Sequence, residues 1–490
     1  MTASPPDTPE LAAENAVDPE GSDLPSATLA TAATPPARDL AASTSVSFDS
    51  MREIWALSWP VMLSQVLLNL VGLIDIAMVG RLGSDAVASV GYASQFFHLS
   101  QSVLFAVGFA TVALMAQAIG AGDPLRARHS LAAALVVSVG TAAVLTAAML
   151  AAPGPLLAML GAEPQVAADA IPYLQLVIGS SLLLSIAMTL EFGLRADRDT
   201  RTPMLIATIV TSVKIAGNGV LIFGAGPFPA LELVGAGLAT LASQVVGLLL
   251  FATVVVRSTR DSPLSLRLGD FAAARAHLGE VVRLTLPGVG ERLANNLALL
   301  AYFRVLSEYG SIAIATYTVG IRLLAFTWIP GIAFGTAAST LVGQALGARQ
   351  EESAQRAGWR ATYLALVVAA ALGGACALMP RMLARLFTED AELIDALVPF
   401  LIVLALVQPA LQSHFTLGGA HRGAGDTFTP FIAATIGNWA IRVPLAALFA
   451  FAFGAPVLWI WLVIFGDHIL RAVWLTWSFQ RGVKPLETTA

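Results

Sequence analysis

Ionisable side chains stand inside long apolar stretches of this sequence, where a charge is hard to solvate. They are Asp75, Glu191, Lys214, Glu291, Arg292, Arg304, Arg322, Arg442, Asp467 and Arg471. A charge at the centre of a membrane-spanning helix costs at least ~2.5 kcal/mol, so each of these groups needs a partner or a function. A buried acid that is paired with a cation can titrate when that partner moves. The chemistry that these residues predict is reversible ion binding.

In the first half of the chain, Asp75, Lys214 and Asn218 form the candidate ion-binding group. Lys214 lies close to the middle of its apolar run, and Asn218 follows one helical turn later on the same face. We expect Asp75 and Lys214 to make an ionic contact with Asn218 beside it. The same pair could instead be a permanent salt bridge that holds two helices in register, and the sequence leaves that alternative open.

In the second half, Glu291 is the expected principal acid, with Arg442 or Arg322 as its candidate partner. Asp467 lies at a similar depth in the last apolar run, so it joins the candidate group for cation coupling or substrate binding. A purely structural salt bridge is again the alternative. These assignments all require the side chains to face a wet cavity rather than lipid.

Two further acids, Asp199 and Asp426, occupy equivalent turns between apolar runs. Each is followed by Thr and, three residues later, by Pro inside the first turn of the next run. Acidic and hydroxyl residues ahead of an early Pro are typical of a helix start. We therefore expect Asp199 and Asp426 to be structural turn residues.

The sequence argues against an enzyme and against a metal centre. It contains a single cysteine, Cys376, and six widely separated histidines. We find no HExxH, no GxSxG and no phosphate-binding loop, the spacings that would indicate a metalloprotease, a hydrolase or an ATP-driven pump. We therefore expect no catalytic residues, no metal ligands and no organic cofactor.

Composition indicates a membrane protein. Hydrophobic residues make up 57% of the 490 residues and charged residues 12%, with a mean hydropathy of +0.75. Crossing a bilayer takes about 20 apolar residues per helix. Runs of that length lie near 54–80, 86–118, 128–152, 167–192, 201–224, 233–256, 281–306, 312–345, 356–379, 391–419, 428–453 and 456–480. The sequence predicts an all-α polytopic membrane protein with twelve transmembrane helices.

The two halves of the chain repeat each other at an offset of 227 residues. Pro60 matches Pro287, Gln117 matches Gln344, and Asp199 matches Asp426. Six helices per repeat is an even number, so the copies share one orientation and are related by a pseudo-twofold axis along the membrane normal. We expect two six-helix bundles, at 51–258 and 281–480, that rock about a central cleft and expose it to each side in turn.

The remaining segments are a tail at 1–50, a linker at 259–280 and a tail at 481–490. The first tail holds eight acids and one basic residue, Arg38, and its composition is typical of disorder. Arginines gather in the loops on the side of both tails. The positive-inside rule therefore predicts that both termini and the linker are cytoplasmic, in a multi-pass protein of the cell's inner membrane.

Several segments resemble the multidrug and toxic-compound extrusion (MATE) transporters. They are Pro60 to Gly83, Gln117 to Gly122, Gln344 to Ala348 and Arg422 to Thr427. The resemblance implies a V-shaped pair of bundles that exports cationic or amphipathic compounds, driven by protons or sodium ions. Asp75 and Glu291 match positions where family members carry acids. The Leu411–Gln412 region lacks the acid of NorM-like members, and Lys214 also departs from the pattern, so the coupling ion stays open.

Two other functions compete with an antiporter. A flippase for lipid or polysaccharide precursors also needs a polar cleft, and the cations inside the spans keep it open. A membrane-embedded transferase needs paired acids or a metal motif, and we find neither. For an antiporter we expect small-molecule substrates and the lipid bilayer as partners, no nucleic acid, and a monomer.

Overall fold

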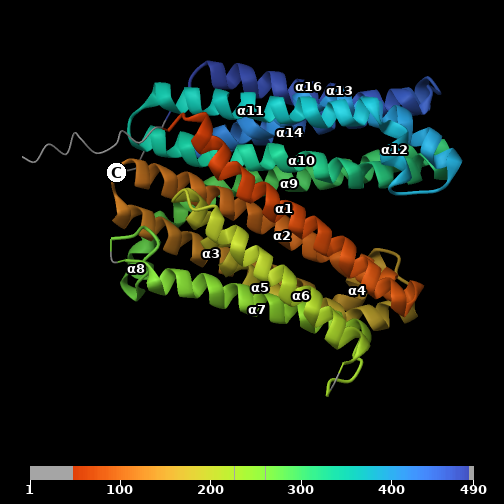
Figure 1. Cartoon of the computed structure of the whole chain (residues 1–490), viewed down its shortest axis with the longest axis horizontal. Coiled ribbons are helices and arrows are strands. Elements are labelled where there is room, and N and C mark those ends of the chain that lie inside the picture. The colour runs from red at the N-terminus through yellow and green to blue at the C-terminus, as the bar shows by residue number, and fades with distance from the viewer. Residues whose placement is uncertain (1–47, 226, 260, 485–490) are drawn as a thin grey trace, which may run out of the picture. The chain divides into compact units, whose positions relative to one another are not determined.

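The computed structural model describes residues 48–225, 227–259 and 261–484, and its regular elements are helices (Figure 1). The first bundle consists of α1 (Met51–Val79), α2 (Ser84–Gly120), α3 (Pro124–Ala151), the short α4 (Pro153–Met159), α5 (Pro164–Ala196), α6 (Arg201–Phe223) and α7 (Glu232–Arg257). After a short α8 (Leu268–Ala273), the second consists of α9 (Leu278–Leu306), α10 (Gly310–Gly347), α11 (Glu351–Leu378), the short α12 (Pro380–Arg385), α13 (Ala391–Gly423), α14 (Phe428–Ile436), α15 (Val443–Ala447) and α16 (Val457–Gln480).

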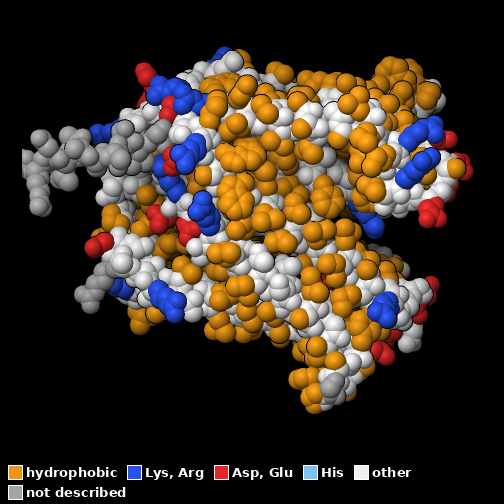
Figure 2. All heavy atoms as spheres, in the orientation of Figure 1, with side chains coloured by type: hydrophobic (Ala, Val, Ile, Leu, Met, Phe, Trp, Pro, Cys, Tyr) orange, Lys and Arg blue, Asp and Glu red, His pale blue; other side chains and the backbone are white. Residues whose placement is uncertain are grey.

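The helices are long and apolar enough to cross a bilayer. Within the described residues, eleven helical segments meet that requirement, and one of them, Leu268–Gly347, contains both α9 and α10. Figure 2 shows charged side chains gathered at the two ends of the helices and hydrophobic side chains between them. The predicted all-α fold with twelve spans is confirmed.

The sequence repeat is visible in the backbone. Helices α1 and α9 are both 29 residues long, and α5 and α13 are both 33. Left-handed φ angles recur at Gly83 (121°) and Gly310 (82°), and at Arg198 (64°) and Gly425 (85°). Each of these pairs is separated by the 227-residue offset, so the turns of the two bundles are equivalent.

The bundles contact each other reciprocally. Helix α1 packs against α10, and its equivalent α9 packs against α2. Helices α2 and α10 also contact each other, so that the first two helices of each repeat form the interface. We call the end of the bundles at which α1 begins and α16 ends the terminal end.

The structure adds detail to three of the expected segments. Most of each predicted tail, residues 1–47 and 485–490, lies outside the described residues. At the end of the first tail, Phe48 is buried, and Asp49 accepts a hydrogen bond from Arg356 at 2.7 Å. The linker 259–280 contains α8. Helix α13 runs one turn beyond the expected 419.

The span expected at 428–453 is not one regular helix. It contains two π-helical segments. Gly437–Arg442 lies between α14 and α15, and Leu448–Ala452 follows α15. Pro444 lacks the N–H that a regular helix would donate to the carbonyl four residues earlier, which favours a change in hydrogen-bond spacing here. Within the first segment, Asn438 and Arg442 contact residues of α16.

Candidate functional site

A cavity of about 860 Å³ lies between α1, α2, α5, α6 and α7 of the first bundle, and residues of α10 complete its wall. Its lining is largely apolar, but amide and imidazole groups interrupt it, namely Gln65, Asn69, Gln95, His98, Gln101 and Gln244. Pockets that bind small molecules measure ~300–1,000 Å³ and have this mixed character. The cavity could therefore hold an amphipathic organic molecule.

Asp75 lies on the cavity wall, on α1, and contacts two residues of α6. Its carboxylate forms an ion pair with Lys214, and Asn218 Nδ2 donates to Asp75 Oδ1 at 2.6 Å. Lys214 and Asn218 are one helical turn apart, so both reach the same carboxylate. The side chains of Asp75 and Lys214 are 19% and 21% exposed, so water can reach the pair. The contact expected between these three residues is present, whereas its role in coupling stays a prediction.

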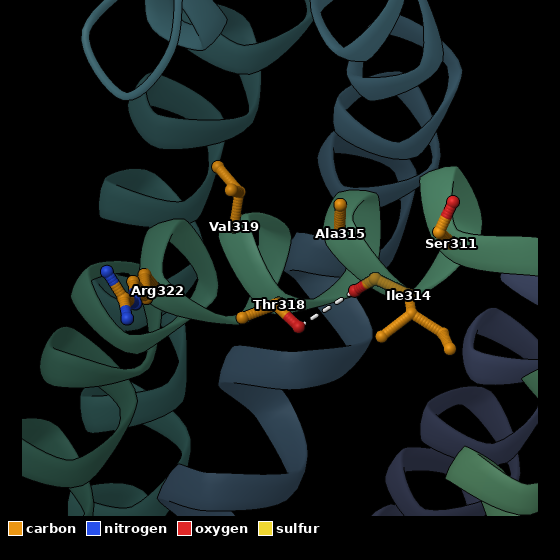
Figure 3. Close-up of a pocket in the computed structure, with 6 residues that line it drawn as sticks. All are labelled: Ser311, Ile314, Ala315, Thr318, Val319 and Arg322. Carbon is orange, nitrogen blue, oxygen red and sulfur yellow. Dashed lines mark hydrogen bonds between the residues drawn. The ribbon is translucent and has the colours of Figure 1, made fainter. Parts of the chain in front are cut away.

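Three further charged residues line the cavity. Glu191 and Arg195 form an ion pair one turn apart on α5. Arg322 comes from α10 of the second bundle, where Figure 3 shows it at one end of a groove lined by Ser311, Ile314, Ala315, Thr318 and Val319. Arg322 makes no ion pair with any residue that the structure describes. With Lys214, the cavity wall carries three cations and two carboxylates.

The prediction of the partners of Glu291 is wrong. Neither Arg442 nor Arg322 contacts it; instead, Arg422 Nη2 donates to both of its carboxylate oxygens at 2.8 Å. Arg422 belongs to the extra turn of α13, and its guanidinium also lies 4.8 Å from the ring centre of Phe109 on α2. The Glu291 pair therefore lies against the other bundle.

Asp467 lies at the centre of a buried network in the second bundle. Its side chain is 0% exposed, with Arg442 at 2.5 Å and Arg471 at 2.6 Å. Arg471 also donates to Asn438 Oδ1, and Asn438 donates to Asn295, each at 2.6 Å. Two guanidinium groups thus pair with one carboxylate that is removed from water, and two amide oxygens accept further hydrogen bonds from Arg471, as buried charges require.

The π-helical segment makes room for this network. A methyl group added at Gly437 would overlap the Asp467 carboxylate and lie 2.7 Å from Arg471 Nε. The rings of His414 and His468 stack beside the network at 4.9 Å, and His468 also contacts Arg442 at 3.4 Å. The sequence placed Arg442 and Asp467 in the site individually, but it did not predict that they pair.

Asp199 and Asp426 lie in turns at the terminal end, outside the spans. Asp199 accepts hydrogen bonds from the backbone N–H groups of Arg201 and Thr202, and Asp426 accepts one from Thr429 at 2.9 Å. Burial opposes ionisation of Asp426, but hydrogen bonds from His421 and Thr429 outweigh it and hold its pKa below the usual value. Both acids contact the start of the following helix, as the turn pattern indicates.

Sequence reasoning missed two contributors to these sites. Glu191 lies at the end of the apolar run expected at 167–192, yet it lines the cavity because α5 continues for another turn to Ala196. Arg422 lies beyond the end expected at 419, but inside α13 in the structure. A helix-propensity reading of the residues after 192 and 419 could have extended both helices.

Comparison with known proteins decides the family. A sequence model of the MatE family matches residues 60–220 and 287–448, one stretch in each repeat. This chain belongs to the MatE family. MatE proteins and the relatives below are transporters, so the chain is a multi-pass membrane protein of a multidrug efflux family.

Several named relatives match this MatE protein over nearly their whole length. A probable multidrug resistance protein NorM of Bradyrhizobium diazoefficiens is 32% identical over 443 residues, covering 84% of this chain and 90% of that protein. The NorM of Thermotoga maritima is 28% identical and covers 88% and 92%. A protein of Shewanella oneidensis named FAD transporter is 26% identical and covers 88% and 96%.

Solved MatE-type structures share the fold. A MOP superfamily transporter from Pyrococcus furiosus superposes with a TM-score of 0.82 at 23% identity, covering 89% of this chain and 96% of that one. An outward-facing multidrug resistance transporter of the MATE family gives 0.81 at 24% identity and the same coverage. The two-bundle architecture expected from the repeat is confirmed.

Proposed function

We propose that the chain is a secondary active antiporter that exports small amphipathic organic compounds in exchange for cations by alternating access. The observation that carries the proposal is the Asp75–Lys214–Asn218 group, which is partly exposed on the wall of the cavity. Neutralising Asp75 would break its ionic bond to Lys214 and leave the hydrogen-bonding capacity of Asn218. Helices α1 and α6 could then shift relative to each other.

We propose protons rather than sodium ions as the coupling ion. Lys214 and Asn218 already contact the two oxygens of the Asp75 carboxylate, which leaves less room for a sodium ion and its ligands. Arg422 occupies the corresponding position beside Glu291. A proton needs only one carboxylate oxygen and no coordination shell. Glu291 stays a predicted second acid, held by its arginine against the first bundle.

The terminal end is proposed to be cytoplasmic, in the inner membrane. The arginines of the loops at this end, such as Arg126, Arg201 and Arg275, support that orientation by the positive-inside rule. The chain is proposed to act as a monomer, because one copy contains both bundles and the complete cavity.

Reconstitution in lipid vesicles tests the proposal. A pH gradient or a sodium gradient is imposed separately, and efflux of a cationic and an anionic amphipathic dye of similar size is followed by fluorescence. We expect the pH gradient alone to drive efflux of at least one dye, and the sodium gradient to drive neither. Efflux driven by sodium would overturn the choice of ion, and no gradient-driven efflux would overturn the antiporter.

A flippase for anionic lipid precursors is the second candidate. The observation that favours it is the excess of cations on the cavity wall, with Arg322 lacking a carboxylate partner among the described residues. Transfer of a fluorescent anionic lipid between leaflets of the same vesicles, in the absence of any gradient, would support the flippase instead of the antiporter.

A further inference from the structure

The two bundles exchange matched hydrogen bonds at the terminal end. Gln117 Nε2, near the end of α2, donates to the carbonyl oxygen of Gly423 at 3.1 Å. Gln344 Nε2, near the end of α10, donates to the carbonyl oxygen of Ala196 at 2.7 Å. Both the donors and the acceptors are 227 residues apart. The two bonds are therefore equivalent by the repeat and run in opposite directions between the bundles.

Two glycines allow α2 and α10 to approach each other closely at this contact. A methyl group at Gly120 would overlap the carbonyl of Gln344, and one at Gly347 would overlap the carbonyl of Gln117. These glycines are again one repeat apart. The last turns of α2 and α10 therefore meet backbone to backbone, and only residues without a side chain allow it.

The accepting carbonyls belong to helix ends. Ala196 is the last residue of α5, and Gly423 is the last residue of α13. Carbonyls in the last turn of a helix have no partner within that helix, so water can replace the glutamine without breaking the helix. The two bonds can thus open and close at little cost.

Arg198 adds a further contact to Gln344. Arg198 Nε donates to Gln344 Oε1 at 2.5 Å, and its guanidinium pairs with Glu53. Arg198 adopts a left-handed φ of 64°, which side chains other than glycine rarely take, whereas its repeat equivalent is Gly425. The Arg198 side chain thus links Gln344 of the second bundle to Glu53 of the first.

We propose that Gln117 and Gln344 form a reciprocal amide latch, which holds the terminal end closed and opens once in each transport cycle. The latch rests on the alternating access of the proposed function. Each uncharged bond of this kind shifts a closed-to-open equilibrium by about two- to tenfold. Loss of Gln344 also releases Arg198.

Distance measurements between two spin labels test the latch on the full chain. Labels are attached to Leu125→Cys and Glu352→Cys in a Cys376→Ser background. Leu125 is 48% exposed and the Glu352 side chain 92%, and the two positions are equivalent in the repeat. Without a gradient or substrate, we expect a predominant short distance. Gln117→Glu and Gln344→Ala should each lower the ratio of short to long distances by about two- to tenfold.

Gln350→Ala is the matched control, because this exposed glutamine at the same end makes no side-chain hydrogen bond with the described residues. It should leave the distances unchanged. A merely structural role would lower the thermal midpoint of Gln117→Glu and Gln344→Ala without changing the ratio, and that result would overturn the latch. Since the measurement needs no transport, a failure of gradient-driven efflux would not affect it.

Discussion

The two bundles place their carboxylates in opposite surroundings although they descend from one repeat. In the first bundle, Asp75 stands on the wall of a cavity, with one lysine and one amide as partners. In the second, Asp467 is sealed from water between Arg442 and Arg471. Water and ions can reach the first carboxylate, whereas the second must keep its partners to stay ionised.

This difference separates a site that can change its charge state from one that holds helices together. Breaking a buried pair by removing one partner is costly, because it leaves an uncompensated charge. A partly exposed pair can be replaced by water or by a ligand. Under the proposed function, we expect ion coupling at Asp75, with Glu291 as a second acid, and helix positioning at the Asp467 network.

The largest expected effect is on transport, from Asp75→Asn. The amide has the shape of the carboxylate but cannot take up a proton, so pH-driven export should fall to the level of empty vesicles while membrane levels stay normal. Glu291→Gln is predicted to act in the same direction. Asp169→Asn, at an exposed position of α5, is the control and should export normally. Undiminished export by Asp75→Asn would remove the assignment.

Asp467→Asn should have the largest effect on stability. It leaves two guanidinium groups without a carboxylate in the protein interior, at a cost of about 3–5 kcal/mol. Thermal unfolding in detergent should show a much lower midpoint than for Asp75→Asn, which is the same substitution at a wetter site. Equal midpoints for the two variants would erase the contrast between the bundles.

Gly437→Ala sharpens the comparison at the π-helical segment. The added methyl group would collide with Asp467 and Arg471, and overpacking of this kind costs about 1–3 kcal/mol. Gly140→Ala on α3 is the matched control, since no atom lies within 4 Å of the added group. It should be neutral or slightly stabilising. A neutral Gly437→Ala would show that the network is looser than described.

The smallest effect is a pH dependence at the terminal end. Burial, aided by Asp199 and opposed by Arg198, raises the pKa of Asp197 to about 6 from 3.8. If opening exposes Asp197 to water, its pKa returns toward 3.8 in the open arrangement. The protonated carboxyl then stabilises the closed arrangement relative to the open one fully below pH 3.8, and this stabilisation is lost as pH rises through about 6. Between about pH 5 and pH 7 the short-distance fraction should fall, severalfold at most. Asp197→Asn should abolish the dependence.

Much of the fold could be predicted from the sequence, because a bilayer allows few solutions. Long apolar runs with charged edges fix the number of spans, and the 227-residue offset fixes the relation of the halves. The contact of Asp75 with Lys214 and Asn218 also follows, since one turn of α6 presents both side chains to one neighbour. These inferences need only helical periodicity and the cost of burying a charge.

The ionic contacts of the second bundle could not be predicted, because they depend on where helices end and on an irregular backbone. Glu291 meets Arg422 only because α13 continues for one more turn. Arg442 reaches Asp467 from a π-helical segment, where the spacing of side chains differs from that of an α-helix. Neither feature leaves a periodic signal in the sequence.

Efflux per folded molecule, compared between Asp75→Asn and Asp467→Asn in the same vesicles under an imposed pH gradient, tests the division of roles most directly. Asp467→Asn is expected to give less folded protein that still exports, and Asp75→Asn to give normal amounts of protein that does not. The reverse result, with export retained without Asp75 and lost without Asp467, would contradict the account and move ion coupling from Asp75 to Asp467.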